Sequence, residues 1–173
     1  MSNTRWMTLV GMILVAALTR LLPHPSNISP IAAMALFGGA TFADRRSAFL
    51  IPLAAMFVSD LVLGFHALMP LVYFCFITTV MLGRWIRTRH GVRTIIPATL
   101  ASALFFFLVT NFGVWATSGM YPMTASGLFT CYIAAVPFFQ SSLIGDFTSV
   151  AVLFGGFSLL EKWVPTLRTP NPA

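Results

Sequence analysis

The sequence predicts an all-α integral membrane protein with six transmembrane helices. Hydrophobic residues make up 58% of the chain and charged residues 8%, whereas soluble domains carry roughly 25% charged residues. A span needs about 20 apolar residues, so 173 residues leave room for about six spans with short loops. Runs such as 48–58 and 100–109 are apolar on every face, which favours helices over the alternating strands of a β-barrel. We expect one transmembrane domain over residues 1–173.

Proline, glycine and charged residues separate the six apolar stretches. Arg20 and Pro23 end the first stretch, and no small-residue cleavage site follows, so we interpret it as a retained span rather than a signal peptide. The second stretch is short and rich in Ala and Gly, which lets helix backbones approach closely in lipid. The predicted spans are residues 6–22, 28–42, 47–63, 71–86, 95–115 and 142–160.

The stretch before the last span predicts a lid-like segment over residues 116–141. Residues 127–160 are mostly apolar, and as one helix they would measure roughly 51 Å, which is too long for one span and short for two. Pro137, Gln140, Gly145 and Asp146 are expected to interrupt the helix. We therefore place a partly inserted segment first and the last span after it.

The basic residues predict the orientation. Only Arg20 of the ten Lys and Arg residues lies near the opposite side of this topology. Because cytoplasmic loops carry an excess of Lys and Arg, both termini are predicted to be cytoplasmic, in the inner membrane of a bacterium. The net charge of +6 is then a matter of topology, and we expect no nucleic-acid partner. The nine residues on the cytoplasmic side are Arg5, Arg45, Arg46, Arg84, Arg87, Arg89, Arg93, Lys162 and Arg168.

Polar residues within or beside the spans gather at the outer ends. Polar groups at membrane depth are costly and usually face a cavity or each other, so they are candidate functional residues. The structural alternative is that the carboxylates and Asn111 cap helix ends or pair with Arg20. Aromatic residues on the same side, Tyr73 among them, line an apolar site or form an interfacial belt. The polar residues are His24, Asn27, Asp60, His66, Asn111, Gln140 and Asp146.

Cys75 lies just over one turn into the fourth span, near this polar group. It is a small buried hydrophobe, a disulfide partner of Cys131, or a soft thiolate ligand for a metal. His24 lies between two prolines in the first outer loop. A His and a Cys approaching from opposite sides suit a metal with two axial positions, such as the cobalt of a corrin. The sequence has no zinc-site spacing and no HExxH, GxSxG, Walker or GxGxxG motif.

Two stretches carry a family resemblance. RLLPHPSNISPIAAMALFGG at residues 20–39 resembles the first loop and second span of the membrane-embedded substrate-binding components of energy-coupling factor (ECF) vitamin transporters. SDLVLG at residues 59–64 resembles the end of their third span. Six spans, cytoplasmic termini and a pocket built from outward loops also match that family. Within it, the chain is most similar to the BtuM group, solitary components proposed to carry cobalamin.

The resemblance implies a vitamin-uptake protein that binds cobalamin in an outward-facing pocket. Cys75 would ligate the cobalt, and His24 would take the opposite axial position. Displacement of cyanide from cyanocobalamin by the Cys75 thiolate would add a slow enzyme-like step, with Cys75 as its catalytic residue. The remaining ligand-binding residues assigned on this basis are Asn27, Asp60, His66, Tyr73, Asn111 and Asp146.

The first span departs from the family pattern. Classical members carry an Ala-x-x-x-Ala pattern there, which docks the shared transmembrane subunit, whereas this span offers Gly11, Ala16 and Ala17 without such a pair. The departure favours solitary operation without a dedicated energising module. Because the chain has no nucleotide-binding motif, energy must come from a partner, or transport is passive.

Three other functions remain open at this point. The same scaffold suits another vitamin or small organic substrate, with Cys75 as a packing residue. An intramembrane enzyme would use Asp60 or Asp146, although no second carboxylate lies within one helix turn of either. A structural or assembly protein would bind no ligand at all.

Overall fold

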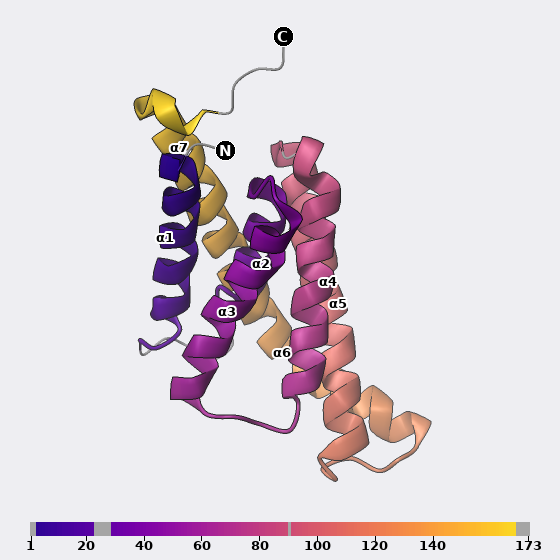
Figure 1. Cartoon of the computed structure of the whole chain (residues 1–173). Coiled ribbons are helices and arrows are strands. Elements are labelled where there is room, and N and C mark those ends of the chain that lie inside the picture. Colours follow the sequence, from indigo (N-terminus) through magenta and orange to yellow (C-terminus); the bar gives the residue numbers. More distant parts are fainter. Residues whose placement is uncertain (1–2, 23–28, 90, 169–173) are drawn as a thin grey trace.

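The computed structural model describes residues 3–22, 29–89 and 91–168, which form a bundle of helices (Figure 1). The predicted all-α class is confirmed for these residues. The first and the last of the described residues lie at the same end of the bundle (Figure 1). The α-helices are α1 (Asn3–Thr19), α2 (Ile31–Thr41), α3 (Arg45–Leu63), α4 (Met69–Ile86), α5 (Val92–Thr117), α6 (Ala125–Val150) and α7 (Gly156–Trp163).

Four helical stretches in the described part of the chain are long and apolar enough to cross a membrane. They are α3, α4 with a short 3₁₀ extension to Arg89, α5, and the continuous run of α6 and α7. Helix α1 has 17 residues and α2 has 11, both below the roughly 20 residues that a span needs. The structure therefore supports a helical membrane protein with four full-length spans, and the six-span count stays a prediction.

The largest difference from the expected boundaries is at α6. This helix begins at Ala125 and continues through a π-helical turn at Ala151–Gly155 into α7. The hydroxyl of Thr124 accepts a hydrogen bond from the Gly127 N–H (3.1 Å) and starts the helix. Pro137 lies inside the helix without ending it, because membrane helices tolerate proline where local adjustments satisfy the freed backbone groups. A short turn over residues 118–124 and the first half of α6 thus occupy the place of the expected lid.

Helix α2 is the centre of the bundle. All its residues from 33 to 41 are buried, and it packs most extensively against α4. A Cβ on Gly39 would lie 2.3 Å from the carbonyl oxygen of Val80, and a Cβ on Gly83 would lie 2.4 Å from that of Leu36. The two backbones are close enough that only glycine fits at both positions, which confirms the close approach expected from the small residues of this stretch.

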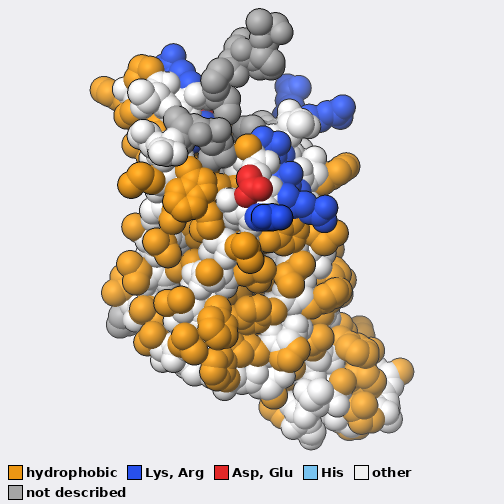
Figure 2. Space-filling view, viewed as in Figure 1, with side chains coloured by type: hydrophobic (Ala, Val, Ile, Leu, Met, Phe, Trp, Pro, Cys, Tyr) orange, Lys and Arg blue, Asp and Glu red, His pale blue; other side chains and the backbone are white. Residues whose placement is uncertain are grey.

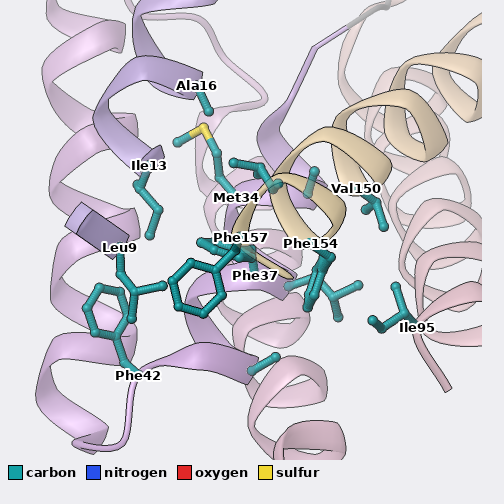
Figure 3. Close-up of a cluster of buried hydrophobic side chains, with 14 of the residues drawn as sticks. Leu9, Ile13, Ala16, Met34, Phe37, Phe42, Ile95, Val150, Phe154 and Phe157 are labelled. Atoms are coloured by element: carbon teal, nitrogen blue, oxygen red, sulfur yellow. The ribbon is translucent and has the colours of Figure 1, made fainter. Parts of the chain in front are cut away.

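The largest buried apolar cluster joins α1, α2 and the α6–α7 run (Figure 3). The ring of Phe37 packs edge-on against Phe154 and Phe157, with ring centroids 5.1 and 5.8 Å apart. Leu9 and Ile13 of α1 close the other side of this cluster (Figure 3). Side-chain packing of this kind holds helices together in lipid, where burial of apolar surface supplies little driving force.

Exposed basic side chains gather at one end of the molecule, and most of the remaining surface in view is apolar (Figure 2). We call this end the basic end; it carries the termini and the α2–α3 and α4–α5 connections. Arg5 is buried here, where it pairs with Glu161, donates to the carbonyl of Leu167 and lies 4.8 Å from the Phe157 ring centroid. These contacts tie the start of α1 to α7 and the segment that follows it.

Candidate functional site

Two groups of polar residues lie away from the basic end. The first is a buried ion-pair network of Arg20, Ser59, Asp60 and Tyr73. The second lines a cavity between α4, α5 and α6, which we call the Asp146 cavity. They differ in one respect that bears on function, because the polar groups of the network bond to each other and those of the cavity do not.

The ion-pair network joins the end of α1 to α3 and α4. Arg20 donates to the Asp60 carboxylate at 2.7 Å, to the Ser59 hydroxyl and to the Met56 carbonyl at 3.3 Å. The Tyr73 hydroxyl donates to the second Asp60 oxygen at 2.8 Å. The Arg20 and Asp60 side chains are 8% and 7% exposed. The Asp60 carboxylate therefore pairs with Arg20, which was the structural alternative to a ligand-binding role.

The Asp146 cavity has a volume of about 320 Å³. Its lining combines apolar side chains with a few polar ones, a composition typical of small-molecule sites. Asp146 is buried, whereas His66, in the connection between α3 and α4, is exposed. The cavity therefore runs from an exposed rim to a buried carboxylate. The lining residues are His66, Leu68, Val72, Ala103, Phe106, Phe107, Thr110, Asn111, Val114, Ala135, Phe138, Phe139, Ser142 and Asp146.

Helical periodicity explains why these residues face one space. On α5 the lining residues recur at intervals of three and four from Ala103 to Val114, and on α6 they do so from Ala135 to Ser142, with Asp146 one turn further. Residues three and four apart share one face of a helix. The cavity is thus enclosed by one face of each helix, and α4 closes it with Val72.

The polar lining presents mainly hydrogen-bond acceptors. The hydroxyls of Thr110 and Ser142 donate to carbonyls one turn back on their own helices, at 2.8 and 3.0 Å. The Asn111 amide donates to the Phe107 carbonyl at 2.8 Å. Since these hydroxyl protons are used within the helices, the hydroxyl oxygens offer lone pairs to the cavity.

Asp146 is the unusual member of this lining. The residue is 8% exposed, and no described residue donates a hydrogen bond or an ion pair to its carboxyl group. A buried carboxylate without a partner is costly, so such groups are paired, protonated or completed by a ligand. No other carboxylate belongs to the described lining of this cavity.

Comparison with known proteins places the chain in a family. Residues 1–167 match the model of DUF6580, described as a family of unknown function. The chain belongs to this family. No curated protein and no solved structure matches the DUF6580 chain.

The predicted site residues of this DUF6580 protein fall into separate groups. His66, Asn111 and Asp146 line one cavity, while Asp60 and Tyr73 belong to the ion-pair network. The predicted residues His24 and Asn27 lie outside the described residues. Gln140, also noted in the sequence, is not in the described lining.

Cys75 is 1% exposed and does not belong to the described lining of the cavity. Cys75 and Cys131 are both free thiols in this structure, so no disulfide joins them. The Cys131 thiol donates to the Asn111 carbonyl at 3.5 Å. Within the described ranges no three His, Cys, Asp or Glu residues are grouped as a metal site would require.

Sequence reasoning missed Thr110 and Ser142 of the cavity. Both are ordinary hydroxyl residues in apolar helices, and neither stands out by composition. Their spacing would have found them: Ser142 is four residues before Asp146, and Thr110 directly precedes Asn111 on the face that continues from Phe106. Extending the helical face of each polar residue predicts such neighbours.

Proposed function

We propose that this DUF6580 protein is a membrane-embedded solute-binding component of an uptake system, comparable to the substrate-binding components of ECF vitamin transporters. The observation that supports the proposal best is the Asp146 cavity, which is enclosed by membrane helices and contains an unpaired buried carboxylate. Intramembrane ionisable residues that face a cavity mark substrate pathways by default. The solute is a small organic molecule, and it is held between α4, α5 and α6.

The proposed orientation follows from the basic end. Lys and Arg are enriched in cytoplasmic loops. The basic end therefore faces the cytoplasm, and the helices span the inner membrane of a bacterium. His66 lies in the connection between α3 and α4, and the positive charge gathers at the other end of these two helices. The rim of the cavity then opens to the outside, where an uptake protein receives its solute.

The size of the cavity favours a small solute. Its 320 Å³ is near the lower limit of roughly 300–1,000 Å³ for small-molecule pockets, whereas a corrin macrocycle with its side chains and nucleotide tail needs far more space. Cobalamin remains the specific ligand that the resemblance predicts. Its binding through Cys75 would require the thiol to become accessible, because Cys75 is buried in this structure.

Equilibrium dialysis tests the solute-binding proposal. The full chain, reconstituted in lipid nanodiscs, is dialysed against a mixture of water-soluble vitamins that includes cyanocobalamin, and the retained compounds are measured by mass spectrometry. A matched variant, Ala135→Phe, fills the cavity from α6, where Ala135 is 9% exposed. We expect one compound to be retained by the native protein and lost from the variant. Retention of none, or equal retention by both proteins, would argue against the proposal.

Absorption spectroscopy tests the cobalamin assignment separately. If Cys75 ligates cobalt, the native protein shifts the bands of added cyanocobalamin, and Cys75→Ser abolishes the shift and any loss of cyanide. Cys131→Ser is the matched control, because Cys131 is also a buried free thiol. Unshifted bands with the native protein would remove cobalamin and leave the small-solute function in place.

A further inference from the structure

We infer that the Asp146 cavity selects a small organic ammonium ion, which places its charged nitrogen against the Asp146 carboxylate. This inference rests on the proposed solute-binding function and specifies the chemical class of the solute. Three independent features of the described lining support it: the charge of the buried carboxylate, the kind of hydrogen-bonding atoms around it, and the aromatic rings that face the same space.

The charge of Asp146 is the first feature. Removing a carboxylate from water is costly unless an opposite charge accompanies it. Arg20 is the buried arginine away from the basic end, and its guanidinium already bonds to Asp60 and Ser59. No Lys or Arg is present in the described lining. A cationic solute would supply the missing charge, whereas an anionic solute would be repelled.

The hydrogen-bonding atoms are the second feature. An ammonium group is a donor and has no acceptor. The Asn111 amide and the rim residue His66 can donate as well as accept. The atoms nearest in the chain to Asp146 are acceptors: its own carboxylate oxygens and the Ser142 hydroxyl oxygen, and the Thr110 hydroxyl on α5 is likewise an acceptor, because the protons of both hydroxyls are bonded to the Phe138 and Phe106 carbonyls. Ser142 lies one helical turn from Asp146, so both can contact one nitrogen. Hydroxyl acceptors beside a carboxylate match a protonated amine rather than a carboxylate or phosphate.

The aromatic rings are the third feature. Phe107 of α5 and Phe139 of α6 pack with their centroids 4.6 Å apart across the cavity lining, and Phe106 and Phe138 line the same space. Cations are attracted to the faces of aromatic rings, and more strongly when water is excluded. The rings therefore favour the charged end of the solute as well as its apolar part.

Calorimetry with matched probes tests the inference. Benzylammonium chloride, benzyl alcohol and sodium benzoate share one ring and differ in charge, and each is titrated into the full chain in lipid nanodiscs. We expect benzylammonium to bind more tightly than the other two. Asp146→Asn should weaken its binding by about tenfold or more, because the charge-assisted hydrogen bond to the ammonium nitrogen is lost. Asp44→Asn is the control, because Asp44 is exposed and precedes α3.

Other outcomes separate this inference from the proposed function. If benzyl alcohol binds as tightly as benzylammonium, or if Asp146→Asn binds benzylammonium as the native protein does, the ammonium selectivity is overturned while the vitamin dialysis still decides solute binding. If none of the three probes binds the native protein, the inference is also overturned. Should Asp146→Asn fail to fold, Ser142→Val replaces it, with an expected weakening for benzylammonium only.

Discussion

At the scale of single residues, two buried aspartates away from the basic end have opposite surroundings. Asp60 accepts hydrogen bonds from Arg20 and Tyr73, whereas Asp146 has no partner among the described side chains. The pairing makes Asp60 a structural residue that joins α1, α3 and α4. The lack of a partner makes Asp146 the residue best suited to receive a ligand.

Removing one partner of the ion-pair network should strongly destabilise the protein. Arg20→Met leaves the Asp60 carboxylate buried with the Tyr73 hydroxyl but without an opposite charge, which should lower the free energy of unfolding by about 3–5 kcal/mol. Replacing both residues, Arg20→Met with Asp60→Leu, should cost less than the single change because no uncompensated charge remains. Reversible unfolding in mixed detergent micelles measures both variants. A double variant that is less stable than Arg20→Met alone would contradict the structural role.

The hydrogen bonds of Asp44 at the basic end should make the stability of the protein depend on pH. Its carboxylate accepts hydrogen bonds from the backbone N–H groups of Ser47 (2.6 Å) and Arg46 (3.2 Å) at the start of α3, and the Ser47 bond lowers the pKa of Asp44. A lowered pKa means that the contribution to stability is present above the unfolded pKa of about 3.9 and is lost as the pH falls through the folded value. Asp44→Ala should therefore lower the melting temperature at pH 7, and the difference should narrow in strong acid. If the difference in melting temperature between the two proteins stays constant with pH, the Asp44 carboxylate does not stabilise the start of α3.

The sequence predicted part of this residue-level picture. It indicated that polar residues gather away from the basic side, and three of them, His66, Asn111 and Asp146, do line one cavity. It could not distinguish Asp60 from Asp146, because the partner of Asp60 comes from the end of α1, 40 residues away along the chain. Pairing across helices depends on tertiary packing, which no local spacing records.

At the scale of elements, the contact between α2 and α4 determines how closely the bundle packs. Gly39 and Gly83 face each other there, and a Cβ atom on either would lie only 2.3–2.4 Å from an opposing carbonyl oxygen. So close an approach is possible only between small residues. The composition of α2 predicted it, although α2 is shorter than the expected span and is buried along most of its length.

Glycine replacements test this contact. Gly83→Ala must displace α2 or α4, and overpacking of this kind typically costs 1–3 kcal/mol. Gly11→Ala is the matched control, because a Cβ at Gly11 meets nothing within 4 Å and alanine favours the helix. We expect a lower melting temperature for Gly83→Ala and an unchanged or higher one for Gly11→Ala. Equal effects of the two changes would show that the α2–α4 contact is loose.

The boundaries of α6 show where sequence rules for soluble helices fail in a membrane protein. Pro137, Gly145 and Asp146 were expected to break the helix, yet α6 runs through all three. In lipid an unbonded backbone group is so costly that the helix persists past residues that would end it in water. Because the helix persists, residues 116–141 form a short turn and a helical segment instead of the expected lid.

At the scale of the whole molecule, positive charge and the cavity lie in different parts of the bundle. Exposed basic side chains gather at the basic end (Figure 2), and the rim of the cavity lies at the α3–α4 connection. The proposed uptake function would use this separation, with the basic end in the cytoplasm and the rim of the cavity facing outward.

Cysteine accessibility tests the orientation. In a background with Cys75→Ser and Cys131→Ser, single cysteines are introduced as Ser118→Cys, after α5, and Thr88→Cys, between α4 and α5. Both positions are exposed. A membrane-impermeant maleimide should label the first in intact spheroplasts and the second only after permeabilisation. The reverse pattern would place the basic end outside and overturn the proposed direction of uptake.

Native mass spectrometry tests solute binding in the Asp146 cavity most directly. The full chain is released from nanodiscs prepared from native membranes, and its mass is compared with that of the Ala135→Phe variant, in which the cavity is filled. We expect the native protein to carry a small organic molecule that dissociates on activation, and the variant to carry none. A native protein free of any adduct, or the same adduct on both proteins, would contradict the cavity as the solute site.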